Sequence, residues 1–244
     1  MIKPITKPIT IKYEDRMIKM PPEIEDNIKK FWSEAKEENP NLFNGENHSV
    51  ESVDEKEEYI EMKVAKTNYA TYLYNERIGI PDKNFRIIHI WSGILLETTD
   101  DYFVIGEMCD TTSIPKCLQI PGGGTSDEDI SDGELDIIFN LKRELKEELN
   151  LNLDHIQYEM KYLECPTEKR SVYGFIATGK LDMSKEELNI YFENYKKYLK
   201  ENDLELEFSR LIFLNKSKAI QELDKLDNPK REYLRDLIEI SMQK

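Results

Sequence analysis

Apolar residues recur along the chain at two spacings, which predict an alternation of helices and strands. From 22 to 40 they follow the three-to-four-residue repeat of a helix with one buried face. From 86 to 96 and from 102 to 108 the residues are mostly β-forming, and a polar turn separates the two runs, which predicts a hairpin. Further strands are expected near 49–54, 58–65, 155–164, 172–181 and 204–214, and further helices near 68–76, 134–149, 184–199 and on both sides of Pro229.

A turn at 81–84 marks a reasonable domain boundary. We therefore predict a small N-terminal accessory α+β region, 1–84, and a main domain, 85–244. The order of elements expected in the main domain is β-β-loop-α-β-β-α-β-α, which is typical of an α/β or α+β fold. A length of 244 residues suits one large domain or two of modest size.

The net charge of the chain limits the classes of partner that we expect it to bind. Its formal net charge is −15, whereas a general nucleic-acid binder needs a basic face that neutralises phosphates. Apolar residues make up 39% of the chain, enough for a core, but no run approaches the roughly 18 residues of a membrane span. We therefore expect a small-molecule partner, with neither nucleic acid nor membrane. An acidic chain that handled phosphates would need cations at its site, which suggests a metal.

The cysteine and histidine residues do not indicate a disulfide framework, a zinc site or a catalytic base. The three cysteines form no CxxC pair, which argues against a disulfide framework and against a structural zinc site. His89 lies in the apolar run 87–90 and is predicted to be a buried strand residue rather than a ligand or base. The start of the chain lacks the apolar segment of a signal peptide, so the expected location is a reducing cytoplasm. The sequence leaves the oligomeric state open.

The helix predicted at 134–149 carries the candidate chemistry. Its apolar residues fall on one side at helical spacing and should pack into the core. Glu144, Glu147 and Glu148 stand at i, i+3 and i+4, so their carboxylates project from one neighbouring face and repel one another. A hard divalent cation removes that repulsion, because Mg²⁺ prefers a few carboxylates, waters and substrate phosphate oxygens.

A glycine run, 122–124, precedes this helix by about twenty residues and follows Pro121. Glycines lack Cβ, so their backbone can approach a metal or a phosphate closely. Each half has a plainer interpretation, since PGG is usually a turn and Arg143 with Glu147 is a common surface pair worth roughly 0.3–0.5 kcal/mol. Both halves in this order, with apolar residues on the core side, favour a metal–diphosphate site.

The two halves together resemble the Nudix box. Its pattern is a glycine, five residues, a glutamate, seven residues, and then Arg-Glu-hydrophobic-x-Glu-Glu-x-Gly-hydrophobic. The segment 143–148 matches the second half fully, whereas Asn150 stands where the family has glycine. Asn tolerates the left-handed conformation that ends a helix. The first half is stretched by about five residues, so that Leu135 occupies the expected glutamate position and Glu134 lies one residue away.

The resemblance implies a fold, a reaction and a role for each residue. The fold would be an α/β/α sandwich around a mixed sheet, and the reaction a Mg²⁺-dependent cleavage of a diphosphate bond, with Mn²⁺ as the second possible ion. Glu147 and Glu148 would be metal ligands, Glu144 a further ligand or the base that activates water, and the Gly122 carbonyl a member of the metal shell. Arg143 would be structural and would pair with an upstream acid such as Glu134.

The N-terminal region bears on the substrate. Its segments 31–32, 39–45 and 66–69 are similar to those of a Nudix subgroup that cleaves UDP-glucose and UDP-galactose, which implies products UMP and a sugar 1-phosphate. The plainer interpretation is that Trp32, Phe43 and Tyr69 are core aromatics of an accessory lobe. The sequence also leaves open hydrolysis of ADP-ribose or of nucleoside triphosphates, and a non-catalytic module that binds a nucleotide.

Further candidates lie outside the box. Four cations are possible phosphate ligands, each of which could instead be a solvated surface charge: Arg86, Lys116, Lys169 and Arg170. Glu205 and Glu207 are candidates for a later carboxylate that assists the metal. The segment 124–133 is interpreted as either a mobile acidic lid or a disordered insertion.

Overall fold

A single mixed sheet organises the molecule, which is described here by a computed structural model covering residues 1–168 and 170–243. Thirteen strands of the described residues belong to this sheet. The long strands are β2 (Ile9–Met17), β3 (Glu46–Glu55), β4 (Ile60–Asn68), β5 (His89–Glu97), β6 (Tyr102–Met108), β11 (Gln157–Glu164), β12 (Val172–Lys180) and β13 (Phe208–Asn215). The short ones are β1 (Ile2–Pro4), β7 (Leu118–Gln119), β8 (Gly122–Gly124), β9 (Ile130–Ser131) and β10 (Glu134–Leu135).

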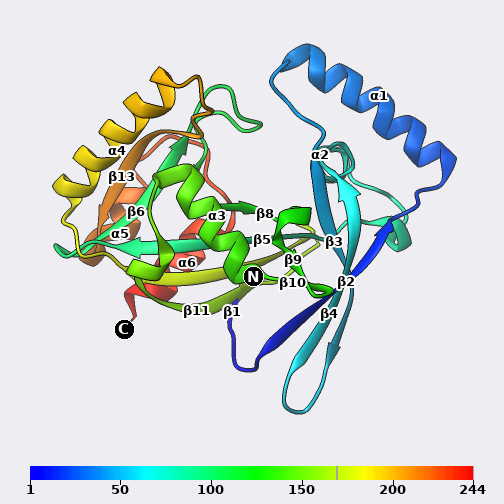
Figure 1. Cartoon of the computed structure of the whole chain (residues 1–244), viewed down its shortest axis with the longest axis horizontal. Helices are drawn as coiled ribbons and strands as arrows, with labels where there is room; N and C mark the ends of the chain where they lie inside the picture. The colour runs from blue at the N-terminus through cyan, green and yellow to red at the C-terminus, as the bar shows by residue number, and fades with distance from the viewer. Residues whose placement is uncertain (169, 244) are drawn as a thin grey trace.

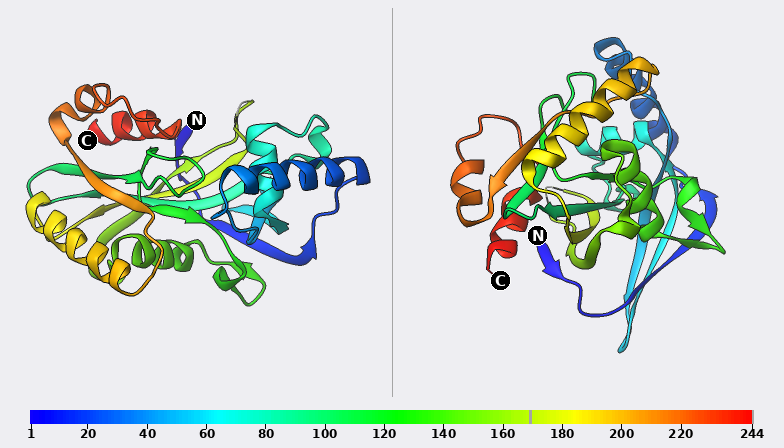
Figure 2. Two further views of the ribbon diagram at one scale, coloured as in Figure 1. Left: turned by 90° about the horizontal axis from the view of Figure 1, so that it is seen from above. Right: turned by 60° about the vertical axis from the view of Figure 1, so that its left-hand side comes forward.

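Helices cover both faces of one half of this sheet. The α-helices are α1 (Pro22–Glu38), α2 (Tyr69–Arg77), α3 (Ile137–Leu149), α4 (Lys185–Glu201), α5 (Ala219–Leu223) and α6 (Tyr233–Met242). Figure 2 (left) shows α3 and α4 on one side of the sheet and α5 and α6 on the other. The predicted α/β class, with an α/β/α sandwich around a mixed sheet, is confirmed. None of these helices, as far as the chain is described, is long and apolar enough to span a membrane.

The central strand β5 faces both helical layers. It runs parallel to β12 and antiparallel to β6. Because side chains of a strand alternate between faces, Trp91 and Leu95 pack with α5 and α6, while Ile94 and Leu96 pack with α3 and α4. The core is therefore made of two layers, one on each side of β5. Because both of its faces are packed, β5 supports the residues that lie at its N-terminal end.

The N-terminal strands extend the same sheet. β3 and β4 form an antiparallel hairpin, β2 runs parallel to β4, and β3 joins β5 where Ser49 lies opposite His89. A third core cluster contains Val50 and Val64 of this region together with Ile90 and Phe175 of the remainder. In Figure 1 these strands lie beside β5, while α1 stands out at the edge of the molecule. The boundary near residue 84 stays a prediction.

The segment 124–133 differs from both sequence-based interpretations, because it is folded. Residues Asp127–Asp129 form a short 3-10 helix, β9 and β10 pair with each other, and Glu134 of β10 lies opposite Lys12 of β2. The helix expected from 134 begins at Ile137, since the strand β10 takes the two preceding positions. The insertion therefore adds an edge to the sheet rather than a loose loop.

Candidate active site

Helix α3 is fixed at both ends by its own sequence. The Asp136 side chain accepts hydrogen bonds from the backbone N–H groups of Ile138 and Phe139, which caps the first turn. At the other end Asn150 adopts a left-handed conformation with φ 55°. Asn150, which stands where the resembled box has glycine, is therefore compatible with the helix end. Leu141, Leu145 and Leu149 are buried in the core, as the spacing predicts.

The glycine strand β8 lies against β5 on one side and α3 on the other. Gly122 is opposite Gly93 in the ladder, and its N–H donates to Glu148 Oε2 at 2.6 Å. A Cβ at Gly123 would lie 2.2 Å from Glu144 Oε2. Glycine at this position therefore leaves the space that the Glu144 carboxylate fills. Loop and helix are in direct contact, as the box resemblance implies.

Three acids converge here, but they are not the three that the helix spacing suggests. Glu144 and Glu148 are buried, at 7% and 2% exposure, whereas the Glu147 side chain is 51% exposed. The third member is Glu207, which precedes β13. Burial raises the pKa of Glu148 well above its usual range, and the Glu207 charge raises it further. Burial likewise raises the pKa of Glu144 to about 8 and that of Glu207 to about 6.

Two acids of this cluster, Glu148 and Glu207, form no ion pair within the described residues, and the cluster fits a hard cation. Glu148 Oε1 is buried and has no hydrogen-bond partner within the described residues. A buried, unpaired carboxylate oxygen is costly unless a metal or proton satisfies it. Within 1–168 and 170–243, however, no three His, Cys, Asp or Glu side chains are grouped so that they could hold a metal on their own. A cation here would need oxygens from water or substrate as well, which is the usual situation for Mg²⁺.

Arg143 is held by a different acid from the one proposed from the sequence. Its Nε and Nη2 donate to Asp129 at 3.2 and 3.1 Å, and Asp129 is 1% exposed. Its Nη1 also lies 2.8 Å from Glu144 and 3.1 Å from Glu147. Glu134 instead pairs with Lys12 at the surface. The folded insertion explains this difference, because it carries Asp129 back onto α3 while Glu134 joins the strand β10.

A cleft of about 460 Å³ opens beside the glycine strand. One wall comes from α2 and the start of β3, and the other from β8 and residue 143 of α3. Four arginines and several aromatic rings line it. The polar, aromatic and glycine residues of its lining include Asn47, Tyr69, Tyr72, Glu76, Arg77, His89, Trp91, Gly122, Gly124, Arg143, Arg170, Glu207, Arg231 and Tyr233. The cleft therefore brings Gly122 and Glu207 together with arginine side chains and aromatic rings.

The structure sorts the predicted phosphate ligands. Arg170 lines the cleft, where it pairs with Glu164 at 3.2 Å. Arg86 donates to the backbone of Glu168, Lys116 is exposed in a turn, and neither belongs to the cleft lining. Lys169 lies outside the described residues. Glu207 belongs to the cleft wall and Glu205 is exposed.

The predicted aromatic residues take three different positions. Tyr69 lines the cleft, Trp32 packs edge-on against it at 6.2 Å between ring centroids, and Phe43 is 81% exposed. The prediction of a buried strand histidine at 89 is confirmed, at 7% exposure. Its ring also lines the cleft, so it is not core alone.

Sequence reasoning missed Asp129, Arg231 and Tyr72. Arg231 follows Pro229 in the C-terminal segment, and its Nε donates to Gln119 Oε1 at 3.1 Å. No carboxylate pairs with Arg231 anywhere in the described part of the chain. An arginine two residues after a proline gives no local signal, because only the tertiary fold brings it to β7. Asp129 has a weak signal, since an acid is needed upstream of Arg143.

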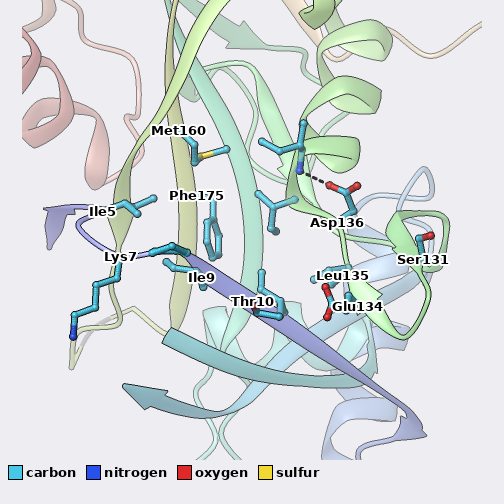
Figure 3. A pocket seen from close by; sticks show the side chains of 14 residues that line it. Ile5, Lys7, Ile9, Thr10, Ser131, Glu134, Leu135, Asp136, Met160 and Phe175 are labelled. Atoms are coloured by element: carbon cyan, nitrogen blue, oxygen red, sulfur yellow. Dashed lines mark hydrogen bonds between the residues drawn. The ribbon is translucent and has the colours of Figure 1, made fainter. Parts of the chain in front are cut away.

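A second cavity, of about 440 Å³, lies on another side of α3. Figure 3 shows that mostly apolar side chains line it, among them Ile5, Met160 and Phe175. Its two acids are already engaged, since Asp136 caps α3 and Glu134 pairs with Lys12. Of the clustered acids, Glu207 lines the cleft at β8, and none of the three lines this second cavity.

Neither a protein-family model nor a curated protein matches the sequence. Solved structures with a related fold include a NUDIX hydrolase from Alicyclobacillus acidocaldarius, 10% identical, which covers 64% of this chain and 96% of its own at a TM-score of 0.45. A protein from Deinococcus radiodurans, 14% identical, covers 66% and 87% at a TM-score of 0.43. A bifunctional NMN adenylyltransferase/ADP ribose pyrophosphatase from Francisella tularensis, complexed with AMP and Mn, is 12% identical and covers 63% and 41% at 0.41. Such remote likenesses do not indicate an activity, which must be inferred from the site of this chain.

Proposed function

We propose that the chain is a divalent-metal-dependent hydrolase of the Nudix type that cleaves the diphosphate bond of a nucleoside diphosphate-linked compound. The observation that carries the proposal is the buried, unpartnered Glu148 Oε1, in a carboxylate that accepts the N–H of Gly122, a residue of the cleft lining. Glu144 and Glu207 supply further oxygens there. Such a cluster suits hard cations, which in turn suit phosphate oxygens.

The residues that would hold the ion are Glu148, Glu144 and Glu207, with the Gly122 carbonyl and Glu147 as further ligands. When bound, Mg²⁺ or Mn²⁺ lowers the pKa of water and neutralises charge on phosphoryl oxygens. The Gly122 N–H orients Glu148, and Arg143 orients Glu144. Glu147 is turned toward Arg143, so its use as a ligand requires a new side-chain rotamer.

The reaction is a hydrolysis in which water attacks one phosphorus. The water oxygen forms a bond to that phosphorus, and the bond from the phosphorus to the bridging oxygen breaks. The bridging oxygen leaves with the second phosphate ester, and the proton of water passes to a carboxylate of the cluster. The acids are coupled, so the accepting residue is assigned to the cluster and not to a single glutamate.

The arginines and aromatic rings of the cleft suit the rest of such a substrate. Arg170 and Arg231 offer guanidinium groups for phosphate oxygens, and Arg231 forms no ion pair with any described residue. Tyr72 and Tyr69 present aromatic surface on the α2 wall. Within this class we propose a UDP-sugar, cleaved to UMP and a sugar 1-phosphate, on the basis of the N-terminal resemblance. The competing substrates are ADP-ribose and nucleoside triphosphates.

Release of phosphate esters tests the proposal. Wild type, Glu148→Gln and the exposed control Glu186→Gln are incubated with UDP-glucose, UDP-galactose, ADP-ribose and nucleoside triphosphates, with and without Mg²⁺. We expect turnover only when the metal is present. Turnover should fall by about 100-fold or more in Glu148→Gln, and Glu186→Gln should turn over as fast as wild type. Equal turnover by wild type and Glu148→Gln would remove the catalytic assignment. Turnover of other compounds without UMP release from UDP-glucose would end the UDP-sugar assignment alone.

One observation favours a second candidate, a nucleotide-binding module. The acids do not form a complete metal shell among the described residues, and Glu147 is engaged by Arg143. Tight, metal-independent nucleotide binding with no turnover of any compound in the panel would support this candidate and exclude hydrolysis.

A further inference from the structure

His89 has a fixed orientation at the cleft. It lies at the start of β5, and its Nδ1 is 2.8 Å from Asn47 Oδ1. Its ring is tilted against that of Tyr72, with 4.4 Å between the centroids. A Cβ at Gly124 would lie 2.9 Å from His89 Cε1 and 3.3 Å from Nε2, so this edge of the ring faces the backbone of the glycine strand. The ring is therefore held from three sides.

The hydrogen bonds of Asn47 determine which nitrogen of His89 carries the proton. The backbone N–H of His48 donates to Asn47 Oδ1 at 2.8 Å, and a backbone N–H cannot accept. The atom that it meets is therefore the amide oxygen. Because the same oxygen lies within hydrogen-bond distance of His89 Nδ1, that nitrogen must be the donor. Nε2 then keeps its lone pair and is an acceptor.

The surroundings of His89 oppose a second proton. Burial lowers the pKa of His89 to about 3, and the charges of Arg170 and Arg231 act in the same direction. The ring faces Tyr72 from α2, Asn47 from β3 and Gly124 from β8, none of which supplies a negative charge. Glu76 also lines the cleft, but it is not among the groups that influence the His89 pKa. The imidazole is therefore neutral across the physiological range, and its free nitrogen accepts but does not donate.

We propose that His89 is a specificity-determining residue whose Nε2 accepts a hydrogen bond from an uncharged O–H or N–H donor in the nucleoside or sugar portion of the substrate. No protein partner for Nε2 occurs within residues 1–168 and 170–243, although the ring lines the cleft. An acceptor that lines a cleft and lacks a protein partner discriminates between ligands, because a ligand without the donor leaves it unsatisfied. An anionic oxygen at this point would meet a lone pair and be rejected.

The position along β8 agrees with this assignment. The ring of His89 faces Gly124, and Gly122 lies two residues away along the same strand, which corresponds to about 7 Å at a strand rise of about 3.3 Å per residue. A group bound at His89 Nε2 is therefore offset along β8 from the Gly122 position. We assign it to a part of the substrate other than the phosphoryl group that is attacked. The inference thus rests on the proposed function and adds the recognition of a neutral group.

Two substitutions separate the roles of the two nitrogens. Asparagine at 89 keeps a donor near the Nδ1 position and removes the acceptor, whereas glutamine keeps an acceptor near the Nε2 position. With UDP-glucose, or with the compound of the panel that is turned over best, we expect His89→Asn to raise KM about tenfold with little change in kcat. His89→Gln should retain most of the affinity, and the exposed control His155→Asn should match wild type.

Analogues identify the donor. For UDP-glucose, methylation of the uracil N3 removes an N–H, and deoxyglucose derivatives remove individual hydroxyl groups. Wild type should lose about tenfold in affinity for one analogue, and His89→Asn should lose nothing further for that analogue. If His89→Asn keeps wild-type discrimination among all the analogues, the proposal is wrong, even when hydrolysis itself is established.

The tautomer can be measured without turnover and without a variant. Nitrogen-15 spectra of the wild-type histidines should show His89 neutral and protonated at Nδ1 at neutral pH, and its Nε2 resonance should shift when UDP-glucose is added without metal. An Nε2-protonated or charged ring would overturn the proposal. If no compound of the panel is hydrolysed, the spectra and nucleotide titrations still decide the role of His89, so its failure and that of the hydrolase assignment are distinguishable.

Discussion

A methyl group at Gly123 tests whether the position of Glu144 matters for catalysis. In Gly123→Ala the new Cβ would lie 2.2 Å from Glu144 Oε2 and 2.6 Å from its Cδ. Real Cβ contacts are not found below 3.0 Å, so the carboxylate must move by about 0.8 Å or more. The backbone of Gly123 is not left-handed, so alanine adds no torsional strain there. A displacement of about 1 Å at a reacting group can cost about 100-fold in rate.

The expected result is a folded protein with kcat/KM for diphosphate cleavage reduced by about 100-fold. Gly133→Ala is the matched control, because a Cβ at Gly133 meets nothing within 4 Å while its φ of +77° strains alanine. That control should lose about 1–2 kcal/mol of stability and keep its kcat/KM. Circular dichroism and chemical denaturation verify folding in both. Wild-type turnover in Gly123→Ala would show that the Glu144 carboxylate has no role in the reaction.

The remaining predictions concern buried charges and the buried histidine. Asp129→Asn should lower the free energy of unfolding, measured in urea, by about 3 kcal/mol, because it leaves the buried Arg143 guanidinium partly unpaired. Glu134→Gln removes one partner of an exposed pair and should lower it by about 1 kcal/mol or less. Arg231→Gln should raise KM for the nucleotide about 10- to 100-fold, whereas the exposed Arg235→Gln should not, and an unchanged KM for the former would exclude phosphate binding at this arginine. The folded-state pKa of His89 lies below the unfolded value of 6.5, so the unfolded chain binds more protons between pH 6.5 and about 3, and stability falls as pH falls through this window. Wild type should therefore lose about 2 kcal/mol relative to His89→Asn between neutral pH and pH 5, and parallel pH profiles of the two proteins would contradict the buried neutral ring.

The elements of the fold were largely accessible from the sequence, because their signals are local. The strand at 102–108 and the capped helix that begins after Ser184 have the expected bounds to within a few residues. Apolar alternation and capping boxes act over distances of four residues or fewer, so each can be read without the rest of the chain. The leucine face of α3 and the burial of His89 belong to the same class.

The composition of the site was less accessible, because it depends on contacts between distant segments. Helical spacing places Glu144, Glu147 and Glu148 on one face, but it does not reveal that Glu147 turns toward Arg143 while Glu207 takes a place beside Glu148. The acids of the cluster differ from Glu147 in how deeply they are buried. That burial results from the packing of β8 and of the segment before β13 against α3. The metal-ligand assignments themselves stay predictions.

The stretched first half of the box has a structural consequence that reaches into the N-terminal region. A buried arginine needs a carboxylate, and the spacing of this chain does not supply one from the expected position. The insertion supplies Asp129, and it is itself anchored by residues of the N-terminal strands β3 and β4. The ring of the fully buried His48 lies between Thr125 and Asp127, with Nδ1 3.0 Å from Thr125 Oγ1 and Nε2 3.2 Å from Asp127 Oδ1.

Lys66 of β4 completes this anchor with an ion pair of 2.5 Å to Asp127. Asp127 is two residues from Asp129, so a shift of β3 or β4 would move the carboxylate that fixes Arg143, and with it the helix face that carries Glu144. The N-terminal strands therefore do more than line one wall of the cleft. They take part in holding the helix that carries the candidate site. The insertion relative to the resembled box is stabilised by these N-terminal partners, which the box segment does not contain.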